Sequence, residues 1–285
     1  MSNLKEYFKK HQIMVFLVMT FLISWTFWGI IYASYKGILS SNIYDRYFTI
    51  FFMLGAFMPS VMSIIVNGCF YGRKGIKALL KKLTIWKVRP FFYIVVLLFT
   101  PVLYYIPLFI CNITGAGYKL PSNISNPVMI LLNFLLVIPF GGPLMEELGW
   151  RGFVLPRLQS KLNPGFSSLI LGIIWACWHL PLFFIPGTSQ YRVPFVIFII
   201  QCIGTAMLYT WVYNQTDGSL LLPILLHASW NCTAGVLFLN CLNIFNYFVK
   251  HSRYTAVFII MCLIVTLAII FDMNRKSSNK VKFST

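Results

Sequence analysis

The chain has 285 residues, of which 59% are hydrophobic and only 10% charged, and its mean hydropathy is +0.78. A soluble domain averages about 25% charged residues, and its hydrated surface could not cover so many apolar side chains. This composition excludes a soluble enzyme, a disordered chain and a fibrous repeat, and it indicates a polytopic helical membrane protein. The basic residues that give the net charge of +17 lie between apolar runs. We therefore expect them to set the membrane topology and to attract anionic lipids, and we expect no nucleic acid partner.

Windows of about 20 apolar residues predict an all-α membrane helix bundle with about eight transmembrane helices, forming a single integral-membrane domain over residues 1–285. The predicted spans are 13–34, 47–70, 91–111, 127–145, 167–186, 194–213, 219–240 and 254–272. With eight spans the most basic connections share one side, so the positive-inside rule predicts cytoplasmic termini. Lys250 and Arg253, on the opposite side, run against this trend. We expect a multi-pass protein of a bacterial plasma membrane.

The segment 73–89, between the second and third predicted spans, carries seven basic residues. Opposite the lysines it has apolar side chains at helical spacing, which are Ile76, Leu79, Leu80, Leu83 and Trp86. This pattern is typical of a helix that lies on the membrane surface and binds anionic lipids. A basic loop without helical structure is the alternative.

Ionisable side chains at membrane depth are costly and mark functional sites. Among six acidic residues and four histidines, only Glu146, Glu147, His179 and His227 have apolar flanks on both sides. Glu147 and Arg151 are spaced to form an ion pair on one helix face, which leaves Glu146 free to act as a general base on water. The alternative is an ordinary helix start whose acids favour the macrodipole.

The fifth predicted span holds Trp175 and His179, four residues apart, so the indole and the imidazole share a helix face. Pro181 breaks the helix just beyond them and makes room for a cavity. The alternative is a histidine bonded to a backbone carbonyl, beside a tryptophan that faces lipid.

The seventh predicted span holds His227 and Asn231, again four residues apart. Two hydrogen-bond donors on one face of an apolar helix suit an oxyanion hole, and structural bonds between helices are the alternative. At a rise of about 1.5 Å per residue, His179 should lie about 18 Å and His227 about 12 Å from the cytoplasmic end of its span. Since the fourth predicted span reaches the cytoplasm at Glu146, we expect the three motifs to converge in the cytoplasmic half of the bundle.

In this order, the three motifs resemble the CPBP family, the CAAX-protease and bacteriocin-processing (Abi) family of intramembrane glutamic endopeptidases. The resemblance covers about residues 127–235. It implies a protease that hydrolyses peptide bonds of membrane-associated peptides or proteins. Bacteriocin processing, self-immunity and peptide-signal maturation are the candidate settings, and eukaryotic relatives cut the last three residues from prenylated CAAX proteins.

The resemblance also implies roles by position. Glu146 would be the base that activates water, with help from His179, and His227 with Asn231 would stabilise the oxyanion.

Three further residues would support the site. Glu147 and Arg151 would hold it in place, as the resemblance implies. The family usually has Phe where this chain has Trp175, and another aromatic side chain preserves the packing role. We therefore expect this departure to affect substrate shape more than catalysis.

We expect no cofactor, because the chain has no HExxH spacing and a Glu–His water site needs no metal. A divalent metal such as zinc, held by the histidines and carboxylates, is the alternative. Other intramembrane protease classes fit less well: there is no GxSxG-like nucleophile, and the aspartates lie at span ends or in loops. The seven cysteines lie mostly in apolar runs and predict no disulfide framework.

Two other functions compete with the protease. One is a non-enzymatic immunity protein or regulatory scaffold that keeps the motifs as structural contacts. The other is a transporter that uses Glu146 and the histidines as a proton relay, although the sequence has no visible repeat symmetry.

Overall fold

The computed structural model describes residues 2–115, 126–191, 193–238 and 251–282. Over these ranges the chain consists of helices and short connections without strands, which confirms the all-α prediction. The N-terminal group comprises α1 (Ser2–Lys10), α2 (Gln12–Tyr35), α3 (Ser41–Ala56) and α4 (Met58–Lys81), followed by a 3₁₀ turn (Lys82–Thr84).

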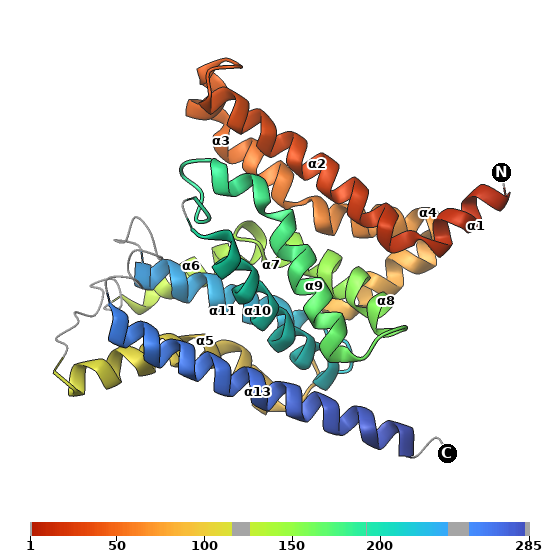
Figure 1. The fold of residues 1–285 in the computed structure, drawn as a ribbon. Coiled ribbons are helices and arrows are strands. Elements are labelled where there is room, and N and C mark those ends of the chain that lie inside the picture. Colours follow the sequence, from red (N-terminus) through yellow and green to blue (C-terminus); the bar gives the residue numbers. More distant parts are fainter. Residues whose placement is uncertain (1, 116–125, 192, 239–250, 283–285) are drawn as a thin grey trace.

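The rest of the fold has a central and an outer group of helices. The central group comprises α7 (Pro143–Glu147), a π-helical segment (Leu148–Val154), α8 (Leu155–Gln159), α9 (Pro164–Trp178), a 3₁₀ turn (Leu180–Phe184), α10 (Phe195–Gln215) and α11 (Leu221–Phe238). The outer helices are α5 (Pro90–Ile113), α6 (Pro127–Phe140) and α13 (Ser252–Lys282). Figure 1 shows α2–α4 along one side, α5 with α13 along the other, and α9, α10 and α11 between them.

Within the described residues, five helical segments are long and apolar enough to cross a membrane: α2, α5, the run Pro127–Gln159, α10 and the part Ser252–Met273 of α13. The bent pair of α3 and α4 makes a sixth if it is one span. A polytopic helical bundle is therefore confirmed, while the count of eight spans and the cytoplasmic termini stay predictions. The fifth predicted span is represented by α9, which has only 15 residues.

The outward surface of the bundle is apolar. On α13, for example, Ile264, Leu267 and Phe271 are 61%, 66% and 71% exposed. Such faces are stable against lipid tails but not against water, because helices satisfy their backbone hydrogen bonds internally while the apolar side chains stay outside. The multi-pass membrane location follows from these surfaces.

The predicted end of the fourth span needs correction. Helical structure continues past residue 145 to Gln159, so that the run from Pro127 is 33 residues long. The regular helix is interrupted at Gly141 and Gly142, between α6 and α7, where Gly142 has a φ of 110°. Because this left-handed conformation is open to glycine and strained for other residues, the break is encoded by the glycine pair. Glu146 therefore lies inside the helical run and not at its cytoplasmic exit.

Local sequence signals set the starts of two helices that frame the site. Asn126 and Asn163 precede α6 and α9, and each side-chain oxygen accepts a hydrogen bond from a backbone N–H in the first turn, at 3.2 and 2.8 Å. Each is followed by proline, Pro127 or Pro164, whose missing N–H costs nothing at the first helical position.

The segment 73–89 is helical only in its first part. The helix α4 is kinked at Gly72, where φ is 59° and ψ is −156°, and it ends at Lys81. The predicted surface helix over 73–89 is thus shorter than expected. Leu79 is buried in the core, whereas Trp86 is 59% exposed beyond the 3₁₀ turn.

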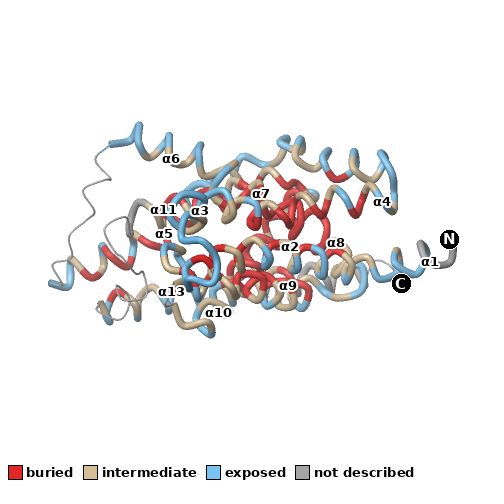
Figure 2. The backbone as a smooth tube through the Cα atoms, turned by 90° about the horizontal axis from the view of Figure 1, so that it is seen from above, coloured by how far each residue is buried: buried red, intermediate tan, exposed pale blue. Residues whose placement is uncertain are grey.

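The buried core lies in the centre of the bundle. Figure 2 shows buried residues gathered around α7 and α9, with exposed residues along α6 and at the ends of the molecule. This core includes polar residues that are almost fully buried, namely Glu146, Glu147, Arg151, His179 and His227. Buried ionisable groups are stable only when they are paired or hydrogen-bonded, so their partners define the site.

Candidate active site

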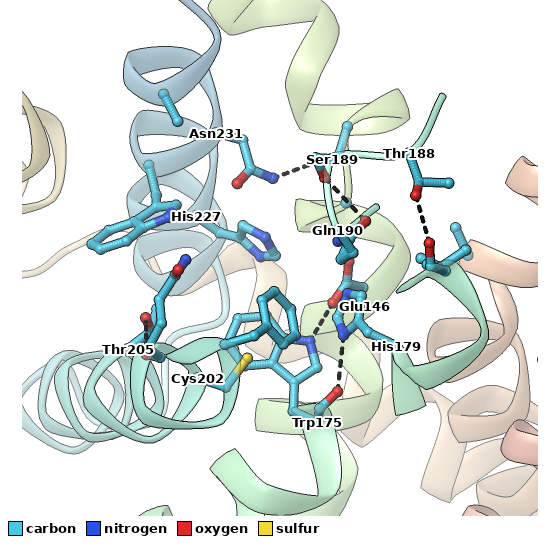
Figure 3. Close-up of a pocket in the computed structure, with 18 of the residues that line it drawn as sticks. Glu146, Trp175, His179, Thr188, Ser189, Gln190, Cys202, Thr205, His227 and Asn231 are labelled. Atoms are coloured by element: carbon cyan, nitrogen blue, oxygen red, sulfur yellow. Dashed lines mark hydrogen bonds between the residues drawn. The ribbon is translucent and has the colours of Figure 1, made fainter. Parts of the chain in front are cut away.

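The three sequence motifs meet at one cavity of about 560 Å³. Glu146 enters it from α7, Trp175 and His179 from the end of α9, and His227 with Asn231 from α11 (Figure 3). The predicted convergence of these side chains is therefore confirmed, while its place in the cytoplasmic half of the bundle stays a prediction. The wall is rich in aromatic side chains, including Trp28, Phe52, Phe140, Trp178, Phe198 and Trp230.

Three polar groups of the site lie around Gly142. A Cβ on this residue would lie 2.9 Å from Glu146 Oε1 and 3.4 Å from both His227 Nε2 and Asn231 Nδ2. A carboxylate oxygen, an imidazole nitrogen and an amide nitrogen thus surround one point in the cavity. The glycine leaves this point open, since any larger residue would occupy it.

Glu147 joins two of the motifs. Its Oε1 accepts a hydrogen bond from Arg151 Nη1 at 3.0 Å, so the predicted i,i+4 ion pair is confirmed. The same oxygen lies 2.8 Å from His227 Nδ1. Because a carboxylate accepts, Nδ1 of His227 carries the proton. The ion pair therefore also fixes the orientation of His227, with Nε2 turned toward Glu146 and Asn231.

A π-helical segment carries the ion pair. Residues Leu148–Val154 are all buried, and the segment begins directly after Glu147. Such widened turns occur mostly at functional positions. Arg151 projects from this segment between two aromatic rings, with its Cζ 4.7 Å from the centre of Trp175 and 4.6 Å from the centre of Tyr209.

This aromatic sandwich stabilises a guanidinium whose side chain is fully buried. A cation over an aromatic face in a desolvated site gains about 2 kcal/mol. Tyr209 was not predicted as a site residue, because one tyrosine in the apolar span 195–215 has no local pattern that marks it. Only the packing of α10 against α9 places it on Arg151.

Trp175 does more than the predicted packing. Its Nε1 donates a hydrogen bond to Glu146 Oε2 at 2.6 Å, and the side chain is 6% exposed. The idea of a lipid-facing tryptophan is therefore wrong. The carboxylate of Glu146 is held at one oxygen and open to the cavity at the other.

His179 is positioned by the backbone of the same residue. Its Nδ1 lies 2.9 Å from the carbonyl oxygen of Trp175. A carbonyl only accepts, so Nδ1 bears the hydrogen and Nε2 of the neutral ring keeps a lone pair. The carbonyl contact matches the structural alternative raised from the sequence, yet His179 also lines the cavity beside Glu146 (Figure 3).

Asn231 closes the ring of polar groups. Its Nδ2 donates to the carbonyl oxygen of Gly141 at 2.7 Å. An amide nitrogen has two hydrogens, so one donor remains for a group in the cavity. The glycine pair 141–142 thus orients Asn231 through one residue and leaves space for a ligand through the other.

The charges of the cluster are close to balance. Glu146 and Glu147 are two buried carboxylates against the single guanidinium of Arg151. One further positive charge in contact with the two carboxylates makes the cluster neutral.

Within the described part of the chain, no three His, Cys, Asp or Glu side chains form a group that could hold a metal ion. His227 Nδ1 and His179 Nδ1 are both engaged with protein oxygens. Independence from metal stays a prediction.

Comparison with known proteins points to the same region. The family model described as type II CAAX prenyl endopeptidase, Rce1-like, matches residues 127–233, which contain all three motifs. The chain also resembles CAAX prenyl protease 2 of Methanococcus maripaludis at 28% identity, over 39% of this chain and 53% of the relative. The chain therefore spans about half the length of this curated relative. These comparisons support the resemblance to the CPBP family over residues 127–233, and we refer to this stretch, by its similarity, as the CPBP core.

The CPBP core coincides with the helices that build the cavity. It runs from α6 to α11 and includes Gly142 and Tyr209, the two residues that sequence motifs did not single out. The glycine pair before Pro143 was the available signal for Gly142, whereas Tyr209 had none. Outside the CPBP core, Trp28, Phe52 and Ala56 of the N-terminal helices complete the cavity wall.

Proposed function

We propose that the protein is a CAAX-protease-like intramembrane endopeptidase that hydrolyses peptide bonds of membrane-associated peptides or proteins. The match to the Rce1-like family supports the reaction class. The observation that carries the proposal is the convergence of Glu146 Oε1, His227 Nε2 and Asn231 Nδ2 around the open point at Gly142. Peptide hydrolysis needs a base for water and donors for the oxyanion, and this geometry supplies both kinds of group.

In the proposed mechanism, Glu146 and His179 handle the protons. A water molecule attacks the peptide carbonyl carbon and gives its proton to Glu146. The carbon–nitrogen bond then breaks, and the leaving amine takes up a proton from Glu146 or through His179 Nε2. Proton transfer by positioned groups of this kind contributes about 10²- to 10⁴-fold to a rate.

The negative oxygen of the tetrahedral intermediate is stabilised by Asn231 and His227. Asn231 offers the N–H that Gly141 does not use. His227 donates from Nε2 only when both ring nitrogens are protonated, because Nδ1 is committed to Glu147. Glu147 holds this ring in place through Nδ1, which is why the ion-pair cluster belongs to the proposed mechanism.

The proposed substrate is a peptide that reaches the cavity from the membrane. The aromatic wall suits an apolar or amphipathic segment, since a cavity of this kind binds chiefly by burying apolar surface. Bacteriocin processing, self-immunity and peptide-signal maturation are the biological settings we propose for it.

The deciding experiment is cleavage by the purified protein in nanodiscs, comparing wild type with Glu146→Gln, each with and without a strong chelator. The substrates are amphipathic leader peptides and a prenylated CAAX peptide, with products identified by mass spectrometry. We expect wild-type cleavage that resists the chelator and is lost in Glu146→Gln. Loss of cleavage with the chelator would instead assign the histidines and carboxylates to a metal.

The non-enzymatic scaffold gives a different outcome. In that case neither form cleaves any substrate, and a cellular phenotype of the protein survives Glu146→Gln. Since Gln keeps the shape of the side chain, an unchanged melting temperature of the variant shows that the comparison concerns chemistry and not folding.

We also propose that anionic lipids bind at the basic segment after Gly72. Arg73, Lys77 and Lys81 line a shallow groove together with Ile76, Leu80 and Thr84. Cationic side chains beside exposed apolar ones match the headgroup and the upper acyl chain of an anionic lipid.

A further inference from the structure

A single residue contacts both groups that the proposed mechanism uses for proton transfer. The indole Nε1 of Trp175 donates to Glu146 Oε2 at 2.6 Å, and the backbone oxygen of Trp175 accepts from His179 Nδ1 at 2.9 Å. Figure 3 shows both contacts at the same edge of the cavity. Glu146 and His179 are thus both held by Trp175, a single residue of α9.

The indole contact decides which oxygen of Glu146 is available. Oε2 is occupied by the indole N–H, and Oε1 lies beside the open point at Gly142, near His227 and Asn231. Without the indole N–H, the carboxylate could rotate about its terminal bond and present either oxygen, since this torsion is broad. A base must point at the proton that it removes, so such rotation lowers the rate.

The ring of Trp175 has a second contact that is separate from its N–H. Its face packs on the guanidinium of Arg151, 4.7 Å from Cζ to the ring centre. A phenylalanine keeps an aromatic face for Arg151 but has no hydrogen to donate to Glu146. The family that this chain resembles usually has Phe at this position. The N–H contact is therefore a feature of this chain.

We propose that Trp175 is a positioning residue, whose indole N–H orients the Glu146 carboxylate so that Oε1 faces the substrate. This inference rests on the proposed function. It adds a donor for the catalytic base where only a packing role was expected.

The kinetic test compares Trp175→Phe with a matched control, Trp211→Phe. Trp211 Nε1 also donates to a carboxylate, Asp272 Oδ2, at 3.0 Å, but it lies on α10 outside the cavity lining. We expect Trp175→Phe to lower kcat by about 10-fold or more, with little change in KM, and Trp211→Phe to leave kcat unchanged. An equal kcat in Trp175→Phe and wild type would overturn the proposal.

A second variant separates the loss of the indole N–H from a change in packing. Replacing Trp175 by 3-benzothienylalanine keeps the bicyclic shape and removes the N–H. The same loss of kcat with an unchanged melting temperature supports the orienting role, whereas full activity assigns any Trp175→Phe defect to packing and overturns it.

A spectroscopic test does not depend on activity. Indole ¹⁵N–¹H spectra of the protein in nanodiscs identify the Trp175 signal by its loss in Trp175→Phe. We expect this signal to move more than the Trp211 signal in Glu146→Gln, since its acceptor loses its charge. If it does not move, the hydrogen bond is absent and the proposal is wrong.

These outcomes separate the two proposals. If wild type cleaves no peptide but the Trp175 signal responds to Glu146→Gln, the proposed protease fails while the contact stands, and the orienting role in catalysis falls with the protease. If wild type cleaves and Trp175→Phe cleaves equally well, only the inference about Trp175 fails.

Discussion

At the scale of single residues, the missing side chain of Gly142 is as informative as the groups around it. The space that its Cβ would fill is where Glu146, His227 and Asn231 converge. In the proposed mechanism the reacting carbonyl or the water stands there. A glycine at this position combines a backbone that needs a φ of 110° with a site that must stay open.

Gly142→Ala should therefore abolish cleavage. We expect a loss of at least about 100-fold, because the methyl group blocks the approach of the substrate to the base. The backbone strain of about 1–3 kcal/mol also lowers stability. Peptide cleavage and the melting temperature measured together separate the two effects.

The control for strain is Gly37→Ala. Gly37 has a φ of 74° and open space around the position of a Cβ. It should lose a similar amount of stability and keep its activity. Equal activity loss in both variants would show that strain, and not the open point, matters at Gly142.

Arg151 gives a prediction about stability. Arg151→Gln leaves Glu147 buried without its cation, and we expect it to lower the free energy of unfolding by about 3 kcal/mol. Activity should fall as well, because Glu147 then orients His227 alone. Thermal unfolding in detergent tests this expectation.

The exposed pair of Lys9 and Glu6 is the matched comparison. Its atoms are 4.0 Å apart and its side chains are 37% and 72% exposed. Lys9→Gln should have no measurable effect, since solvent screens such pairs. A small effect of Arg151→Gln, similar to that of Lys9→Gln, would contradict the view that the buried pair holds the site.

At the scale of elements, the site depends on how closely α9 and α10 pack. Gly172 of α9 lies against the backbone of α10, where a Cβ would be 2.6 Å from Ile203 Cα and 3.0 Å from the Cys202 oxygen. Backbone atoms cannot move aside as a side-chain end can. This contact sets the distance from Trp175 and His179 on α9 to Tyr209 on α10.

Gly172→Ala should push the two helices apart. We expect a loss of stability of about 1–3 kcal/mol from overpacking, together with reduced activity because the aromatic sandwich around Arg151 opens. Gly165→Ala, near the start of the same helix, is the control, since its Cβ would meet only Asn163 Oδ1 at 3.5 Å. A melting temperature equal to that of Gly165→Ala would refute the prediction.

At the scale of the whole molecule, charge and apolar surface decide how the bundle sits in a bilayer. Arg73, Lys77 and Lys81 lie together after the kink in α4. Each basic residue near an anionic surface contributes about 1 kcal/mol, and salt screens the effect. The membrane location itself rests on the apolar helices and not on these charges.

The triple variant with Arg73, Lys77 and Lys81 changed to Gln should retain less anionic lipid. Lipid bound to the purified protein, counted by native mass spectrometry, measures this, and high salt should reduce the difference. The control neutralises two exposed basic residues elsewhere, with Lys36→Gln and Arg46→Gln. Equal lipid retention in both variants would rule out a specific role of the groove.

Composition and residue spacing were enough to predict the class of the protein and its candidate site residues. Composition alone required a helical membrane protein, because no soluble fold can cover so much apolar surface. The expense of ionisable groups at membrane depth reduced the candidates to Glu146, Glu147, His179 and His227. The i,i+4 pairing of Glu147 with Arg151 was also readable, since it lies within one helical turn.

The contacts between these residues, in contrast, follow from the packing of distant helices. The indole of Trp175 reaches Glu146 across 29 positions of sequence, and His227 reaches Glu147 across 80. Contacts of this kind depend on the packing of α7, α9, α10 and α11, which hydrophobic periodicity does not specify. The open point at Gly142 and the contact of Tyr209 with Arg151 were not predicted for the same reason. Both depend on separate helices that come within hydrogen-bond or van der Waals distance of each other.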